Sequence, residues 1–430
     1  MKNPRAKKSV PLNLASPLRP RRVCSLPKGT ACGRLLRFLL PVLAVGFTMT
    51  GALRAFAGRA LTPPVAPAAA RPAAPSGIRV GKLRRGRSQV RAQGLKSHLL
   101  VGYWQTYVNG AVVIPLGQVS PEYDVIDVAF GMPASGTGVV ITLSIDPSIE
   151  TNDQFIADIA TLHKQGQSVV LSIGGASSLI KLTSQKKVKK FVNSVAALIT
   201  QYGFDGVDID FEGNSLKLAP GDSDFKNPKT PEIVNLISGL HTLDGMFEGD
   251  LIITFAPATF NVQAGYTGYH GAQGSYLPVI YGTRDILSWV QTQDYNSGTM
   301  FGLDGNIYTG GTSDFHVAMT EFLLQGFPID HDTNNFFPAL GENQVTFGVP
   351  ASVQAASTSP PSFATPSDVQ NALNYLINGI PYEGHQYTLI NSAGYPEMRG
   401  LMTYSINWDL TNGSAMSNQI GPFLHGLPGE

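Results

Sequence analysis

The chain has 430 residues, of which 43% are hydrophobic and 14% are charged. This composition is typical of a globular protein with a large core, and it excludes a disordered or fibrous chain. All 30 acidic residues, but only 11 of the 31 Lys and Arg residues, lie within residues 98–430. A segment with such an excess of acid is poorly suited to bind nucleic acid or an anionic membrane.

The first 57 residues predict an export signal. A basic stretch without acidic residues, 1–37, precedes an apolar run at 38–49 and a small-residue pattern at 55–57. This order is typical of a secretory signal peptide, and the apolar run is shorter than the roughly 20 residues that span a membrane. Two adjacent arginines at 21–22 leave twin-arginine export open. A start site upstream of a shorter signal is the alternative. We expect a secreted, extracellular protein.

Residues 58–97 are predicted to be a linker that precedes the folded domain, residues 98–430. Residues 58–77 are rich in Pro and Ala, and residues 78–96 are basic without any aromatic residue. A basic stretch that lacks aromatic residues favours a solvated linker over a nucleic-acid site.

Cysteine and histidine usage argues against disulfides and metals. Cys24 and Cys32 are the two cysteines, and both precede the expected cleavage site. The eight His residues include no close pair at the spacing of zinc ligands. We therefore expect a domain that is held by its hydrophobic core and needs no metal and no cofactor.

From residue 98 onward, short apolar segments alternate with amphipathic ones. The predicted strands are 99–104, 125–130, 168–173, 206–211, 251–256, 289–295, 344–349 and 400–406. The predicted helices are 154–165, 186–202, 231–246, 314–324 and 366–376. Eight strands with interleaved helices predict a single (β/α)₈ TIM barrel with a parallel sheet. A doubly wound open sheet is the alternative, but no G-x-G-x-x-G follows the first strand.

The segment 203–212 places three acids on one side of a predicted strand. Because alternate side chains of a strand share a face, Asp208, Asp210 and Glu212 point together into the barrel. Unpaired buried carboxylates are unfavourable, and crowded ones share protons, which raises the pKa of at least one of them. A raised pKa is what a general acid near neutral pH requires. A calcium or magnesium cluster is the alternative, although such ligands usually lie in a turn.

The pattern D-x-x-D-x-D-x-E, from Asp205 to Glu212, resembles the signature of glycoside hydrolase family 18, the chitinases and their relatives. A second motif of that family, S-x-G-G, occurs as Ser172-Ile173-Gly174-Gly175, one strand–helix unit upstream. The resemblance covers residues 98 to 428. We expect Asp205 to be a structural hydrogen-bond acceptor at the start of the strand.

The resemblance implies a role for each residue that matches the family pattern. Glu212 would be the general acid and base, and Asp210 would orient the acetamido group of the substrate. Tyr295 would donate its hydroxyl to the acetamido oxygen, and Asp208, near Ser172, would balance charge behind Asp210. In this family the acetamido group of the substrate is the nucleophile and the configuration is retained. The residues that the resemblance assigns to sugar binding are Tyr103, Phe130, Gln293, Asn296 and Trp408.

The resemblance implies a chitinase whose partner is chitin or its N-acetylglucosamine oligosaccharides. The interval 351–399 has no room for the small extra domain of processive members, so we expect a shallow, open cleft and endo-type cleavage. We also expect a monomer. The Gly- and Tyr-rich loop 260–281 is either a wall of the sugar site or a packed surface loop. Three other functions stay open: an endo-β-N-acetylglucosaminidase that acts on N-glycans, a non-catalytic chitin-binding lectin-like barrel, and a structural or interaction barrel.

Overall fold

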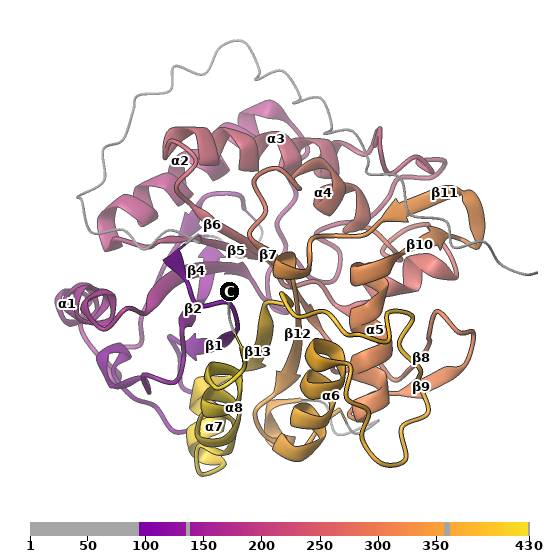
Figure 1. The fold of residues 1–430 in the computed structure, drawn as a ribbon. Coiled ribbons are helices and arrows are strands. Elements are labelled where there is room, and N and C mark those ends of the chain that lie inside the picture. The colour runs from indigo at the N-terminus through magenta and orange to yellow at the C-terminus, as the bar shows by residue number, and fades with distance from the viewer. Residues whose placement is uncertain (1–93, 135–137, 357–361, 429–430) are drawn as a thin grey trace, which may run out of the picture. The chain divides into compact units, whose positions relative to one another are not determined.

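The computed structural model describes residues 94–134, 138–356 and 362–428 (Figure 1). The chain divides into two units, 1–64 and 65–430, and every described residue belongs to the second. The predicted export signal lies outside the described residues, as does the predicted linker apart from 94–97.

Eight parallel strands close into a barrel, which confirms the predicted fold class. In order around the barrel they are β1 (Leu99–Gln105), β2 (Val125–Pro133), β4 (Ser168–Gly174), β5 (Gly206–Asp210), β6 (Ile252–Phe255), β7 (Trp289–Gln293), β12 (Val345–Pro350) and β13 (Gly400–Tyr404). Each strand pairs with the next one, and β13 pairs with β1 to close the ring. A closed ring has no edge strand, so all of its backbone groups can pair within the sheet.

Within the described ranges, eight α-helices surround the barrel. They are α1 (Asn152–Lys164), α2 (Gln185–Tyr202), α3 (Pro231–Met246), α4 (Leu277–Gly282), α5 (Ser313–Gln325), α6 (Pro366–Asn378), α7 (Ile406–Thr411) and α8 (Ala415–His425). Five of them, α1, α2, α3, α5 and α6, correspond to the five predicted helices. No α-helix separates β1 from β2 among the described residues, where a 3-10 turn at Leu116–Gln118 takes its place.

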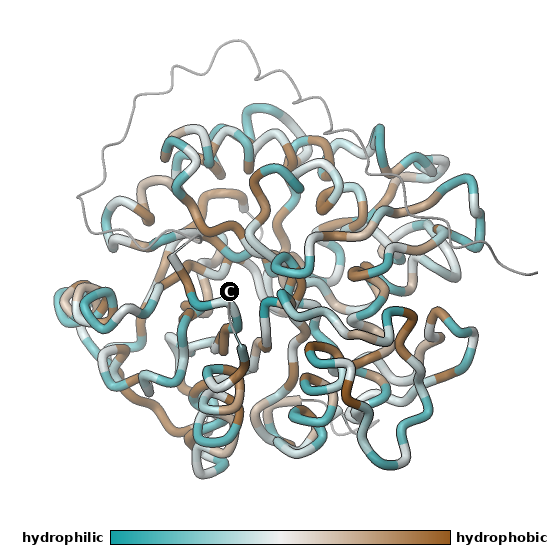
Figure 2. Tube along the Cα trace, in the orientation of Figure 1, coloured by the Kyte–Doolittle hydropathy of each residue, from teal (hydrophilic) through white to brown (hydrophobic). Residues whose placement is uncertain are grey.

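The period-2 pattern of the strands divides the buried apolar residues into two layers. Along β1, Leu99, Val101 and Tyr103 pack inside the barrel. Leu100 and Trp104 pack outside it, between the strands and the helices. Hydrophobic residues accordingly gather on the strands and on the inner faces of the helices (Figure 2). Burial of both faces explains why these strands are apolar throughout.

Several small elements were not predicted. The short strand β3 (Ile141–Thr142) pairs antiparallel with β2. Two hairpins lie between β7 and β12: β8 (Thr299–Phe301) with β9 (Ile307–Thr309), and β10 (Gly326–Ile329) with β11 (Asp332–Pro338). Between β12 and β13, the described residues form a 3-10 turn at Val353–Ala355, helix α6 and irregular chain.

The last barrel strand ends two residues earlier than expected. β13 stops at Tyr404, and the side chain of Ser405 accepts a hydrogen bond from the backbone N–H of Trp408 at 3.4 Å. Serine at this position caps the start of a helix, so the chain turns into α7 instead of continuing as a strand. In the part of the chain that the structure describes, no helix combines the length and apolarity needed to cross a membrane.

Candidate active site

The side chains of β5 alternate as the sequence predicts. Asp208 and Asp210 are buried, with 0% and 3% of their surface exposed, and point into the barrel. Val207 and Ile209 lie in the apolar layer between the strands and the helices. Phe211, the residue after the strand, continues this pattern by packing edge-on against Phe191 of α2. The acids therefore occupy the barrel interior.

Four hydrogen-bond donors surround Asp208. Its Oδ2 accepts from the Ser172 hydroxyl at 2.7 Å and from the Tyr103 hydroxyl at 2.8 Å. Its Oδ1 accepts from the Thr254 hydroxyl at 2.8 Å and from Nε2 of Gln291 at 3.2 Å. Burial raises the pKa of Asp208 while these four donors lower it, and the balance lies at about 6. Between the two carboxyls of β5, Asp208 is thus better prepared than Asp210 to hold a negative charge.

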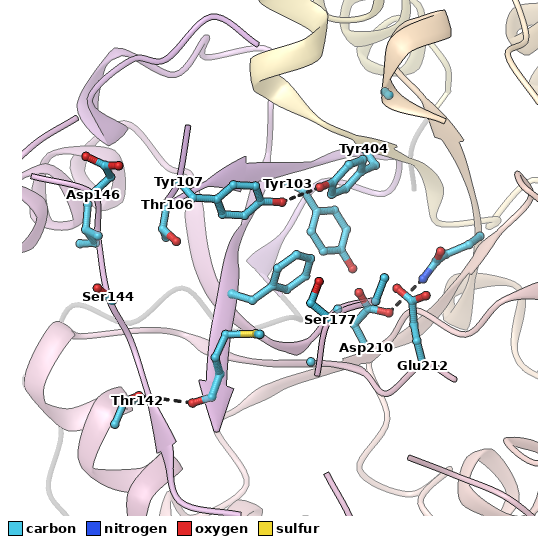
Figure 3. A pocket seen from close by; sticks show the side chains of 18 of the residues that line it. Tyr103, Thr106, Tyr107, Thr142, Ser144, Asp146, Ser177, Asp210, Glu212 and Tyr404 are labelled. Carbon is cyan, nitrogen blue, oxygen red and sulfur yellow. Dashed lines mark hydrogen bonds between the residues drawn. The ribbon is translucent and has the colours of Figure 1, made fainter. Parts of the chain in front are cut away.

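Asp210 and Glu212 lie side by side at the edge of a pocket (Figure 3). The Gln293 side chain reaches them from β7, on the far side of β6, since its Nε2 donates to Oδ1 of Asp210 at 2.9 Å. Burial, followed by the charges of Glu212 and Asp208, raises the pKa of Asp210 well above its usual range. Burial also raises the pKa of Glu212, and a hydrogen bond from Gln293 opposes that shift. Both groups therefore retain a proton at higher pH than an exposed carboxyl would, as a general acid must.

The pocket has a volume of about 820 Å³ and opens at the C-terminal ends of the strands. Active sites of (β/α)₈ barrels lie at this end. Nine of the residues singled out from the sequence line it: Tyr103, Phe130, Gly174, Gly175, Asp210, Glu212, Gln293, Tyr295 and Asn296. Residues that are far apart in the sequence thus converge on one cavity, whose size suits several sugar units.

Aromatic side chains form much of the wall. The ring of Tyr103 is tilted against those of Phe130, at a centroid distance of 6.1 Å, and Tyr404, at 5.8 Å. Tyr295 is 8% exposed, and burial followed by the charge of Asp210 raises its pKa well above the usual range. Its hydroxyl therefore keeps its proton and remains a hydrogen-bond donor.

The sequence profile of the glycosyl hydrolases family 18 matches residues 99–413. This chain belongs to glycosyl hydrolase family 18. A chitinase of Paenibacillus xylanexedens is 48% identical over 329 residues, which are 76% of this chain and 62% of that protein. Chitinase D of Niallia circulans is 47% identical over 333 residues, which are 77% of this chain and 62% of that protein. The chain therefore spans less than two thirds of the length of these curated relatives.

The fold also agrees with that of a solved family 18 structure. A chitinase of this family from Chromobacterium violaceum has a TM-score of 0.69 and 34% sequence identity. That comparison covers 77% of this chain and 84% of the other. The family assignment and the barrel geometry are thus in agreement.

The family motifs lie together at the end of the barrel. Gly174 and Gly175 end β4 with positive φ angles of 133° and 78°. Ser172 lies on the same strand behind the pocket, in contact with Asp208. Asn296 follows β7 with a φ of 57°, and its backbone N–H donates to the Ser362 hydroxyl at 2.8 Å.

Asp205 lies away from the pocket, at the start of β5. Its Oδ2 accepts from the backbone N–H of Val169 at 2.8 Å and lies 2.7 Å from Nε2 of His163. These contacts join β5 to β4 and to the end of α1. The geometry is that of a structural hydrogen-bond acceptor. This is the role expected of Asp205, which lies an odd number of residues from the three acids that point into the barrel.

Trp408 is not where the resemblance implied. It lies on α7, is half-buried, packs against the apolar layer outside the barrel and does not line the pocket. Tyr404, at the end of β13, lines the pocket instead, and its hydroxyl lies 2.7 Å from that of Tyr107. The expectation failed because it extended the strand through Ser405, where the helix cap turns the chain.

The tyrosines of the loop 260–281 do not line this pocket. Tyr276 is fully buried, and its hydroxyl accepts from the backbone N–H of Phe211 at 2.8 Å. Tyr266 packs edge-on against Phe322 and His331. For this pocket, the packing alternative for the loop is the one that the structure favours.

Sequence reasoning missed the far lobe of the pocket and one interior acid. Thr106 and Tyr107 after β1 and the segment 142–147 line that lobe (Figure 3). No local pattern marked these residues, because they lie in irregular chain after short strands. The sequence could have predicted Asp127 on β2. It lies two residues from Val125 and from Ala129, so it shares the face of the strand that points into the barrel. The described residues contain no group of three or more His, Cys, Asp or Glu that could hold a metal ion.

Proposed function

We propose that this protein is a chitinase, which hydrolyses β-1,4-linked polymers of N-acetylglucosamine. The observation that carries the proposal is the pair Asp210 and Glu212, which lines an open pocket with the pKa of both carboxyls raised. Family membership and the names of the relatives support the same substrate.

The charge of the pocket supports a neutral substrate. Among the residues that the structure describes, its lining contains three acids, Asp146, Asp210 and Glu212, and no Lys or Arg. An anionic polysaccharide would meet like charges there, whereas a neutral sugar chain would not. The aromatic wall suits such a chain, because flat rings stack on the apolar faces of pyranose units.

The proposed mechanism is substrate-assisted and retaining. Glu212 protonates the glycosidic oxygen, and the carbonyl oxygen of the substrate's acetamido group attacks the anomeric carbon as the glycosidic bond breaks and the leaving sugar departs as an alcohol. Asp210 accepts the acetamido N–H and the Tyr295 hydroxyl donates to the acetamido oxygen, so the reacting group is held in place. Glu212 then removes a proton from a water that attacks the anomeric carbon, the bond to the acetamido oxygen breaks, and the product keeps its configuration.

Asp208 has a supporting role in this scheme. Four neutral donors hold its carboxylate behind Asp210, at a place that no sugar reaches. A negative charge there stabilises the positive charge that develops on the acetamido-derived ring, through Asp210.

We further propose endo-type cleavage outside the cell by a monomer. The described part of the connection from β12 to β13 consists of a 3-10 turn, helix α6 and irregular chain, which supports a cleft without a large wall from an added domain. The basic, apolar and small-residue order of the first 57 residues supports export, as a polymeric substrate requires.

The test is an assay of the exported protein on chitin oligosaccharides, in which the anomers of the early products are resolved. We expect cleavage with the β-anomer retained. Release of N-glycans without cleavage of chitin oligosaccharides would keep the mechanism but replace the substrate by the chitobiose core of glycoproteins. Binding of oligosaccharides without cleavage of either substrate would favour the lectin-like barrel.

A further inference from the structure

A fourth carboxyl lies inside the barrel, behind the residues of the proposed mechanism. Asp127 on β2 points inward and is 1% exposed. Its Oδ2 accepts a hydrogen bond from Nε2 of Gln291 on β7, at 2.7 Å. Its Oδ1 is buried and has no hydrogen-bond partner among the described residues. A single hydrogen bond replaces only a small part of the hydration that a carboxylate loses when it is buried.

The neighbouring Trp289 determines which end of the Gln291 amide is the NH₂ group. Its indole Nε1, which can only donate, lies 3.0 Å from Oε1 of Gln291. The NH₂ group of Gln291 must therefore face the opposite way, towards the acids. It lies 2.7 Å from Oδ2 of Asp127 and 3.2 Å from Oδ1 of Asp208. One amide thus serves two carboxyls.

The groups around Asp127 disfavour a second negative charge. Asp208 and Asp210 face it from β5, and the neutral Tyr103 hydroxyl, which faces it from β1, donates to Asp208. No Lys, Arg or His of the described residues forms an ion pair with Asp127. Two like charges that share one amide in a dry interior cannot both persist.

The unequal hydrogen bonding decides which acid is charged. Asp208 receives four donors and Asp127 receives one. Burial, followed by the charge of Asp208, raises the pKa of Asp127 well above its usual range, whereas the pKa of Asp208 is about 6. Near neutral pH the charge therefore resides on Asp208.

We infer that Asp127 is a neutral carboxylic acid that positions Gln291, so that the Gln291 amide donates to the Asp208 carboxylate. Asp127 touches no substrate and acts only through this amide. The inference rests on the proposed function in one respect, which is that Asp208 supports Asp210 during catalysis.

The first test compares Asp127→Asn and Asp127→Leu through the pH dependence of kcat/KM. We expect the acid limb of the profile to report the ionisation of the Asp208 carboxyl. In Asp127→Asn the amide oxygen still accepts from Gln291 and no charge changes, so the limb should stay within about 0.3 pH units of wild type. In Asp127→Leu the Gln291 amide loses its shortest hydrogen bond, which holds it beside Asp208, so its bond to Asp208 should weaken and the limb should move to higher pH.

Two outcomes would overturn the inference. If Asp127 were ionised, Asp127→Asn would remove a charge beside Asp208 and shift the limb to lower pH. If Asp127→Leu kept the wild-type profile, Asp127 would have no positioning role.

A second measurement requires neither activity nor the leucine variant. The difference infrared spectrum of wild type minus Asp127→Asn, at neutral pH, should contain the C=O band of a protonated carboxylic acid. A carboxylate band in its place would contradict the inference. Because this readout is independent of turnover, it decides the state of Asp127 even if chitin oligosaccharides are not cleaved and the proposed function fails.

Discussion

Gly174 of β4 passes directly beside the carbonyl oxygen of Asp210. A methyl group placed on Gly174 would lie 1.9 Å from that oxygen, which is far closer than two atoms can approach. The next residue, Gly175, donates its backbone N–H to the same oxygen at 2.9 Å. The two motifs that indicated the family are therefore in contact, and the glycines of one fix the backbone that carries the acid of the other.

We predict that Gly174→Ala severely destabilises the protein. Its φ of 133° is unfavourable for alanine, and its methyl group would collide with backbone atoms that cannot move away. The expected loss is at least about 3 kcal/mol of unfolding free energy, measured by chemical denaturation. Gly203→Ala is the matched control, since Gly203 also has a positive φ of 82° but nothing within 4 Å. It should lose only about 1–2 kcal/mol, and equal losses in the two variants would contradict this account.

Glu212→Gln should abolish most of the turnover. The amide cannot donate the proton that the glycosidic oxygen needs, so kcat on chitin oligosaccharides should fall by roughly 10²-fold or more. Initial rates at saturating substrate measure the effect. Glu150→Gln, which alters another buried glutamate that does not line the pocket, should retain wild-type kcat. An active Glu212→Gln variant would mean that this strand does not carry the acid.

The stability of the protein should depend on Glu150 in a pH-dependent way. Burial raises the pKa of Glu150 to about 7 from its usual 4.5, although the backbone N–H of Leu116 opposes that shift. Because the folded state holds this proton more tightly, its contribution to stability is complete below pH 4.5 and is lost as the pH rises through 7.

Glu150→Gln removes this ionisation. The unfolding free energy of the variant minus that of wild type should therefore increase by about 1–3 kcal/mol between pH 4.5 and pH 8. Denaturation curves at the two pH values measure it. A difference that is the same at both would show that Glu150 titrates normally in the folded protein.

Tyr404 and Trp408 should differ in what their removal affects. Tyr404 lines the pocket, where Nε2 of Gln105 donates to its hydroxyl at 3.0 Å. Tyr404→Ala should lower kcat/KM on chitin oligosaccharides by roughly tenfold or more, which corresponds to about 1.4 kcal/mol. Trp408→Ala should mainly lower the thermal midpoint, because Trp408 packs outside the barrel. The reverse result would restore Trp408 as the sugar-binding aromatic residue.

Local patterns in the sequence were sufficient for the barrel and for its acids. Eight apolar segments predicted eight strands, because a strand buried on both faces must be apolar throughout. The period of two along 206–212 is enough to place Asp208, Asp210 and Glu212 on one side of the strand. The same period along 125–130 places Asp127 on the inward side of β2, although its neighbours there are apolar.

Contacts between distant segments decided the rest. Because Ser405 caps a helix, Trp408 lies outside the pocket and Tyr404 lines it. The hydropathy of this segment did not indicate where the strand ends and the helix begins. Gln291 meets Asp127 and Asp208 only because closure of the barrel brings β7, β2 and β5 around one interior. The sequence by itself determined which side chains point inward, because that depends on the period of a strand. Only the tertiary structure decided which of them meet and which carboxyl keeps its proton, because both depend on distances across the barrel.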